Sequence, residues 1–153
     1  MNDVLTIYVD ADACPVKDEV YVVATRYGVP VALVANTSMY VPGGFGVEMV
    51  VVDEGPDAAD DWIAERAGEG DVVVTADIPL AARCLATGAA VIGTNGRPFT
   101  EDSIGGALAS RDLNSQLREA GIQSGGPRPQ SAKDRSRFLS KLDEAVSRSL
   151  REH

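Results

Sequence analysis

A short apolar run that ends in two aspartates constrains this chain more than any other feature. Residues 5–9 are mostly β-branched or apolar, Asp10 and Asp12 follow, and Pro15 opens the next segment. Such a run is typical of a buried strand, and a proline suits the first turn of a helix. The two aspartates are therefore expected at the carboxyl end of a strand, where open α/β sheets bind ligands. In the plainer interpretation, Asp12 only caps the helix and Asp10 only occupies a turn.

Strand and helix patterns alternate along the rest of the chain, which predicts parallel strands joined by crossover helices. Strands are expected at residues 5–9, 30–35, 47–52, 72–74 and 90–92, the last of the sheet. Helices are expected at residues 16–27, 58–67, 79–87, 101–120 and 132–150. We therefore predict an α/β fold of three layers, α/β/α, with a mainly parallel central sheet and C-terminal helices. Residues 1–153 are expected to form one domain, in which residues 124–131 link to the final amphipathic helix.

Charge is unevenly divided along the 153 residues, whose net charge is −9. Residues 1–105 hold 17 acidic and 5 basic residues, whereas residues 106–153 hold 6 and 9. An acidic body with a basic tail fits a metal site beside a surface that binds a nucleic-acid backbone, and it fits a solvated helix equally well. No apolar run is long enough to span a bilayer and no signal peptide is visible, so we expect a cytoplasmic protein that does not bind membranes.

Acidic residues follow three of the predicted strands, at junctions that a parallel sheet brings to one edge. They are Asp10 and Asp12, then Asp57, Asp60 and Asp61, and then Asp77. Carboxylates gathered in this way suit Mg²⁺ or Mn²⁺, which activates water for phosphodiester hydrolysis. The metal ligands expected here are Asp10, Asp57, Asp60 and Asp77. Capping is the competing explanation for Asp57 and Asp77, and a solvated position is favoured for Asp61.

Histidine, cysteine and other polar residues limit the kinds of catalytic site that this chain can form. His153 is the only histidine and the last residue, which argues against a serine–histidine mechanism or a histidine-bound zinc. Cys14 is expected to be a small buried residue, since no partner histidine is available. Thr75 and Lys17 are candidate phosphate contacts, although a local cap and a solvated lysine are the commoner roles for such residues.

Long strings of this sequence resemble those of the bacterial YaiI/YqxD family. The strings are residues 9–16, 34–36 and 70–81, the pair Asp57 and Asp60, residues 111–112 and 125–127, and Asp134-Arg135 with Phe138. The resemblance runs from about Ile7 to Phe138. That family is grouped with PIN-like domains, which carry a metal-dependent RNase site of carboxylates at the ends of parallel strands.

The resemblance implies roles for particular residues. Asp10, Asp60 or Asp57, and Asp77 would hold the metal, and Asp12 would be a further ligand or hold water. Asn95 stands where relatives usually have arginine, so Arg97 would supply that charge two residues later, or the contact would be lost. The remaining residues assigned to substrate contact are Asn36, Arg111 and Arg135, and Arg118 and Arg137 are further candidates for phosphate contacts.

Three functions follow, in order of preference. The first is a Mg²⁺- or Mn²⁺-dependent PIN-like nuclease, with RNA favoured as the substrate and catalytic residues Asp10, Asp12, Asp60 and Asp77. The second is a phosphohydrolase of the haloacid dehalogenase type, with Asp10 as nucleophile. The third is a module that binds nucleic acid or protein without catalysis. A homodimer is compatible with all three.

Overall fold

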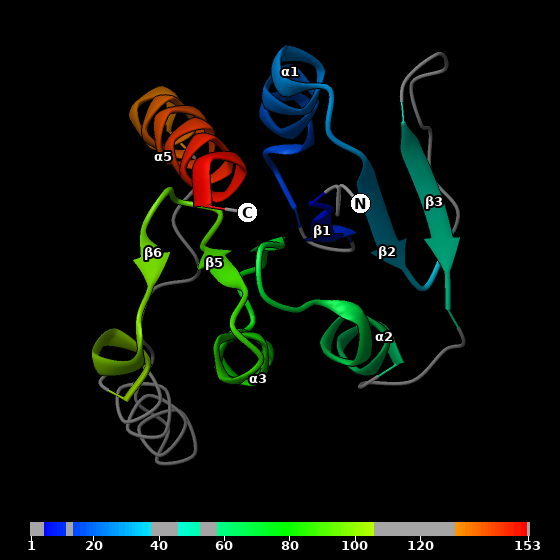
Figure 1. The fold of residues 1–153 in the computed structure, drawn as a ribbon. Coiled ribbons are helices and arrows are strands. Elements are labelled where there is room, and N and C mark those ends of the chain that lie inside the picture. The colour runs from blue at the N-terminus through cyan, green and yellow to red at the C-terminus, as the bar shows by residue number, and fades with distance from the viewer. Residues whose placement is uncertain (1–4, 12–13, 38–45, 53–57, 106–130, 153) are drawn as a thin grey trace, which may run out of the picture.

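A six-stranded sheet forms the centre of the molecule, seen here in a computed structural model that describes residues 5–11, 14–37, 46–52, 58–105 and 131–152 (Figure 1). The strands are β1 (Ile7–Asp10), β2 (Val31–Ala35), β3 (Val47–Val51), β4 (Val72–Val74), β5 (Ala90–Ile92) and β6 (Pro98–Phe99). The helices with defined bounds are α1 (Lys17–Tyr27), α2 (Ala58–Arg66), α3 (Ile78–Ala86) and α5 (Ala132–Glu152). Residues 101–105 are also helical.

The strands lie in the order β3-β2-β1-β4-β5-β6, and all neighbours are parallel except β5 and β6. The chain therefore adds β2 and β3 on one side of β1, then returns to add β4 and β5 on the other side. The loops that leave β1 and β4 diverge at this reversal, which is where open α/β sheets form their ligand crevice. The predicted parallel sheet is confirmed.

Strand β6 was not predicted, because residues 90–92 were expected to be the last strand. The chain turns back at Gly96, whose φ of 87° favours glycine, and Gly93 N–H donates to Arg97 O at 2.9 Å. A strand of two residues is too short to show an alternating pattern, and Pro98 argues against a strand unless the strand lies at an edge, as β6 does.

Helices cover both faces of the sheet, which confirms the three predicted layers. α1 and α5 lie side by side on one face, and α2 and α3 lie on the other (Figure 1). On the first face, β1 side chains such as Ile7 and Val9 pack with Phe138 and Leu142 of α5. On the second face, Val73 packs among residues of α2 and α3. Every residue of β2 and β4 is buried, as expected for strands covered on both sides.

The helix ends agree with the predicted ranges within two residues. α1 stops at Gly28, whose φ of 65° places it in the left-handed conformation that commonly ends helices. α3 begins at Ile78, so Pro79 lies in its first turn, where a missing N–H costs nothing. Most of the predicted helix 101–120 and of the linker 124–131 lies outside the described residues. No helix in the described part of the chain is both long and apolar enough to cross a membrane.

Two contacts set the direction of α5 across the sheet. At its C-terminal end, Ser149 Oγ donates to the carbonyl oxygen of Gly70, which precedes β4. At its N-terminal end, the backbone of Arg137 and Phe138 lies against Gly96, which follows β5. The helix therefore begins at the carboxyl edge of the sheet and ends at the amino edge. Asp143 ties α5 to α1 by accepting hydrogen bonds from Tyr27 and Arg26.

Candidate active site at the carboxyl edge of the sheet

Asp10, Thr75 and Asp77 form a hydrogen-bonded group across the point where the strand order reverses. Thr75 Oγ1 donates to Asp10 Oδ2 at 3.0 Å and accepts from the backbone N–H of Asp77 at 2.9 Å. Asp10 is the last residue of β1, and Thr75 directly follows β4, the neighbouring strand. The sheet therefore brings Asp10 to Thr75 and Asp77, which lie 65 or more positions after it in the sequence, as the pattern of strand ends predicted.

Thr75 is fully buried, whereas Asp10 and Asp77 are partly exposed. A buried hydroxyl that both donates and accepts is held in one orientation, so it fixes the position of the Asp10 carboxylate. Asp10 also has a further interaction beyond this bond. The group is rigid at its base and reaches solvent through its carboxylates.

Asp77 has a structural duty as well. Its Oδ1 accepts from Leu80 N–H at 2.9 Å, so it is the N-cap of α3. The sequence left capping open as the competing explanation, and the structure confirms that capping occurs. This bond occupies Oδ1 and leaves Oδ2 outside it. Capping and a site role are therefore compatible for this residue.

Asp60 and Asp61 lie in the first turn of α2, which also starts at the carboxyl edge. Asp61 is exposed and pairs with Arg83 of α3 at 2.8 Å, in agreement with the solvated role expected for it. Asp60 is partly buried and close enough to Cys84 for its charge to raise the pKa of that thiol, although burial is the larger cause. Asp60 therefore lies close enough to α3 for its charge to act on both Arg83 and Cys84.

Cys14 and Lys17 lie where the chain leaves β1 and enters α1. Cys14 is 5% exposed, and this burial raises the pKa of its thiol, so it is the small buried residue that was expected. Lys17 donates from Nζ to the carbonyl oxygen of Cys14 at 2.9 Å. An ammonium group has three donors, so this bond leaves Lys17 able to contact a phosphate as well.

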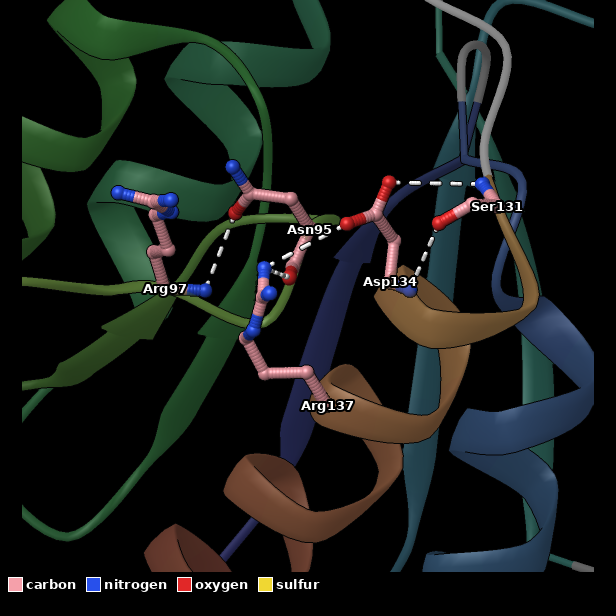
Figure 2. A network of polar contacts seen from close by, with 5 residues as sticks. All are labelled: Asn95, Arg97, Ser131, Asp134 and Arg137. Atoms are coloured by element: carbon pink, nitrogen blue, oxygen red, sulfur yellow. Dashed lines mark hydrogen bonds and ion pairs between the residues drawn. The ribbon is translucent and has the colours of Figure 1, made fainter.

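A second polar network at the same edge joins the β5–β6 turn to the start of α5, and the sequence did not predict it (Figure 2). Arg137 Nη1 donates to the carbonyl oxygen of Asn95 and to Asp134 Oδ1, both at 3.4 Å. Asn95 Oδ1 in turn accepts from the backbone N–H of Arg97 at 3.0 Å. These contacts fix the backbone of Arg97. This exposed residue lies in the turn between β5 and β6, at the carboxyl edge of the sheet.

One part of that network had a signal in the sequence. Ser131 and Asp134 exchange hydrogen bonds in the manner of a capping box: Asp134 N–H donates to Ser131 Oγ at 3.0 Å, and Ser131 N–H donates to Asp134 Oδ2 at 3.4 Å. A serine followed three positions later by an acid, before an apolar periodic run, is the pattern that marks such a helix start. The contact of Arg137 with Asn95 had no comparable signal, because it joins residues 42 positions apart.

Several predicted site residues remain to be placed. Asp12, Asp57, Arg111 and Arg118 lie outside the described residues. Asn36 directly follows β2 and is partly buried, and Arg135 is exposed on α5; each makes a further interaction. Among the described residues, no group of three or more histidine, cysteine, aspartate or glutamate side chains is arranged to hold a metal. The metal site therefore stays a prediction, and two of its candidate carboxylates are not described.

Comparison with known proteins identifies the family. The model of the uncharacterised bacterial YaiI/YqxD family matches residues 8–148. The chain belongs to the YaiI/YqxD family. The matched region runs from the second residue of β1 through most of α5 and so includes every described residue of both polar networks.

Relatives in the YaiI/YqxD family are similar over almost their whole length. A UPF0178 protein of Rhodopseudomonas palustris strain BisB18 is 58% identical over 93% of this chain and 92% of its own. Another from Parvibaculum lavamentivorans is 60% identical over 92% of both chains. A third from Caulobacter sp. strain K31 is 57% identical over 95% of this chain and 96% of its own. No solved structure gave a significant match. The names of these relatives state no activity.

Proposed function

We propose that this YaiI/YqxD protein is a divalent-metal-dependent nuclease, with RNA as the favoured substrate. The observation that carries the proposal is the Asp10–Thr75–Asp77 group at the reversal of the strand order. Ligand crevices of open α/β sheets form at this point, and pairs of carboxylates there favour binding of a cation. The resemblance to PIN-like domains points the same way and stays a prediction.

The donor set fits Mg²⁺ or Mn²⁺. Magnesium is commonly bound through one or two carboxylates together with substrate phosphates and water, rather than by a complete protein cage. Asp10 and Asp77 would supply such a pair of carboxylates, so the absence of a three-acid group among the described residues is compatible with this kind of site. Asp12, Asp57 and Asp60 remain candidates for further ligands.

Each described residue has a role in this proposal. A divalent cation bound at this site would neutralise charge at the phosphoryl group and would lower the pKa of a water molecule so that it can attack at neutral pH. Asp10 and Asp77 would hold the cation, and Thr75 would keep the Asp10 carboxylate in place through the bond to Oδ2. Arg97 and Lys17 would contact the phosphates on either side of the scissile bond, because both lie at the same edge of the sheet.

The proposal is tested by measuring Mn²⁺ binding by calorimetry, and cleavage of single-stranded RNA with Mn²⁺, for three proteins. The first is the wild type, and the second carries Asp10→Asn and Asp77→Asn. Asparagine is as good an N-cap as aspartate, so the second protein should keep α3 intact. The third carries Asp61→Asn, which removes an acid at the same edge that pairs only with Arg83 in the described region.

We expect the Asp10→Asn, Asp77→Asn protein to lose at least about 100-fold in cleavage rate, since even residues that only support metal ligands cost about 10–100-fold. The Asp61→Asn protein should keep wild-type activity. Wild-type protein that neither binds Mn²⁺ in the presence of RNA nor cleaves it would rule out the nuclease. Full nucleic-acid binding without cleavage would favour the non-catalytic binding module instead.

A further inference from the structure

A line of basic side chains runs along one flank of α5, from the carboxyl edge of the sheet to the amino edge. Its members are Lys133, Arg137, Lys141, Arg148 and Arg151, with Glu144 as the single acid. Consecutive members are three or four positions apart, a spacing that keeps them on one side of a helix. We call these six residues the basic flank; its net charge is +4 on a chain whose total is −9.

The direction in which the basic flank faces follows from the contacts of α5. The buried residues Asp134, Phe138, Leu142, Val146 and Ser149 face the sheet. Asp143, on one side of that buried face, contacts α1. Arg137, on the other side, contacts the β5–β6 turn (Figure 2). The basic flank therefore lies on the side of α5 away from α1 and borders the turn that holds Arg97.

Helix stability explains only part of this arrangement. Arg151 lies in the last turn of α5, where a cation interacts favourably with the helix dipole, but Lys133 lies in the first turn, where a cation opposes it. The pairs that Glu144 makes with Lys141 at 3.5 Å and with Arg148 at 3.3 Å are exposed, and exposed pairs contribute little. Asp134 also pairs with Arg137, at 3.4 Å. Two acids cannot neutralise five cations, so a net positive charge remains along the flank.

We infer that the basic flank binds the phosphodiester backbone of a nucleic acid and leads it to the Asp10–Thr75–Asp77 group. From Lys133 to Arg151 the flank is about 27 Å long at about 1.5 Å per residue, so it contacts several successive phosphates. It starts beside Arg97 at the carboxyl edge, where the candidate site lies. The choice of a nucleic acid as the anion rests on the proposed function.

An anionic membrane is the other large surface that a basic helix could contact. Amphipathic helices that bind membranes insert an apolar face into the lipid. The apolar face of α5 is already packed on the sheet through Phe138, Leu142 and Val146, all fully buried. Leu150 is the large hydrophobic side chain that α5 exposes. A nucleic-acid backbone, which needs charge and no apolar contact, fits the flank better.

The test measures binding of a fluorescently labelled single-stranded oligouridylate by anisotropy, over a range of salt concentrations and with EDTA present. EDTA removes divalent metal, so cleavage does not enter the result. One variant carries Lys133→Gln and Lys141→Gln on the basic flank. The matched control carries Arg66→Gln and Arg83→Gln on α2 and α3, across the sheet, and changes the net charge equally. Thermal unfolding verifies that both variants are folded.

Each phosphate contact contributes a salt slope of about −0.7 on a single strand, which at about 0.1 M salt is about fivefold in affinity. We therefore expect the Lys133→Gln, Lys141→Gln variant to bind about 25-fold more weakly than wild type, with a slope shallower by about 1.4. The control should stay within about twofold of wild type, since distant exposed charges are screened. Adding Arg148→Gln and Arg151→Gln should weaken binding further if the whole flank is used.

Three outcomes would overturn the inference. They are a wild type that does not bind the oligonucleotide, an equal loss in the flank variant and the control, and binding to phosphatidylserine vesicles in preference to the oligonucleotide. These outcomes differ from failure of the nuclease proposal. A flank that binds RNA in EDTA, in a protein that cleaves nothing with Mn²⁺, would support the flank and reject the nuclease.

Discussion

The two edges of the sheet differ in what they offer a ligand. At the amino edge, a cavity of about 320 Å³ is lined mainly by apolar groups, including Tyr21, Val29, Pro30 and Val47. At the carboxyl edge lie the Asp10–Thr75–Asp77 group, Arg97 and the start of the basic flank. This cavity therefore lies at the opposite edge from the charged groups. Its mainly apolar lining offers little to hold charge, which hydrolysis of a phosphodiester needs.

Two aspartates at opposite ends of β4 show the same difference on a smaller scale. Asp71, which precedes β4, accepts backbone hydrogen bonds on both oxygens, from Thr6 and from Gly68, each at 3.0 Å. Asp77, which follows β4, uses Oδ1 to cap α3. Its backbone N–H donates to Thr75 Oγ1, which in turn donates to Asp10. Asp71 is thus committed to holding the backbone, whereas Asp77 combines a structural bond with a position in the candidate site.

The largest effect on stability is expected from Gly96→Ala at the carboxyl edge. A Cβ there would lie 2.6 Å from Phe138 N and 2.7 Å from the carbonyl carbon of Arg137, and the φ of 87° would be strained in any case. We expect unfolding free energy to fall by about 4 kcal/mol, from roughly 1–2 for the left-handed backbone and roughly 1–3 for the overlap. Urea unfolding measures it.

Gly28→Ala is the matched control at the amino edge. Its φ of 65° is also left-handed, but a Cβ there would meet nothing within 4 Å. It should therefore cost only the backbone strain, about 1 kcal/mol. Equal losses at the two glycines would mean that α5 is not packed tightly on the β5–β6 turn, and the position of the basic flank beside Arg97 would then be in doubt.

The next largest effect is a difference in stability and activity between variants of Asp71 and Asp77, the two aspartates that flank β4. Asp71→Ala leaves two backbone N–H groups without their acceptor and should lower the unfolding free energy by about 2–3 kcal/mol. Asp77→Ala loses one cap and should cost about 1 kcal/mol. Urea unfolding measures both, and RNA cleavage measured well below each midpoint separates the roles: Asp71→Ala should keep its activity, and Asp77→Ala should lose it. The opposite pattern would break the contrast between the two edges.

The smallest expected effect comes from the buried thiols and arises only at alkaline pH. Burial, with the Asp60 charge as a smaller cause, raises the pKa of Cys84 to about 11 from 9.0. The unfolded chain loses this proton first as pH rises, so the folded state binds more protons between pH 9 and about 11 and stability falls across that window. Urea midpoints below and above the window should decline less in Cys84→Ala than in wild type.

Cys14 is expected to contribute to the same loss of stability at alkaline pH. Burial raises the pKa of its thiol too, so it adds to the decline in the same direction. Neither thiol should react with iodoacetamide in the native protein at neutral pH, because the reactive form is the thiolate. Rapid alkylation of Cys14 alone would show that the carboxyl edge opens readily to solvent.

Local patterns in the sequence determined the strands other than β6, the helix ends and the acidic residues that lie at the carboxyl edge. The run before Asp10, the valines before Thr75 and the glycine after α1 each specify a strand or a stop through nearest-neighbour preferences, which need no distant partner. The rule that parallel strands share an edge then brings Asp10 and Asp77 together. For that reason the positions of Asp10 and Asp77 at one edge of the sheet could be predicted from the amino-acid sequence alone, and their roles there stay a prediction.

Tertiary structure alone decided which distant groups meet. The bond from Thr75 to Asp10, the close approach of Gly96 to α5 and the contact of Arg137 with Asn95 join residues 65, 41 and 42 positions apart. No local preference encodes such pairs, because they depend on strand order and on how α5 lies across the sheet. The spacing of the basic residues was always in the sequence, but only the packing of α5 determines that they face outward beside the candidate site.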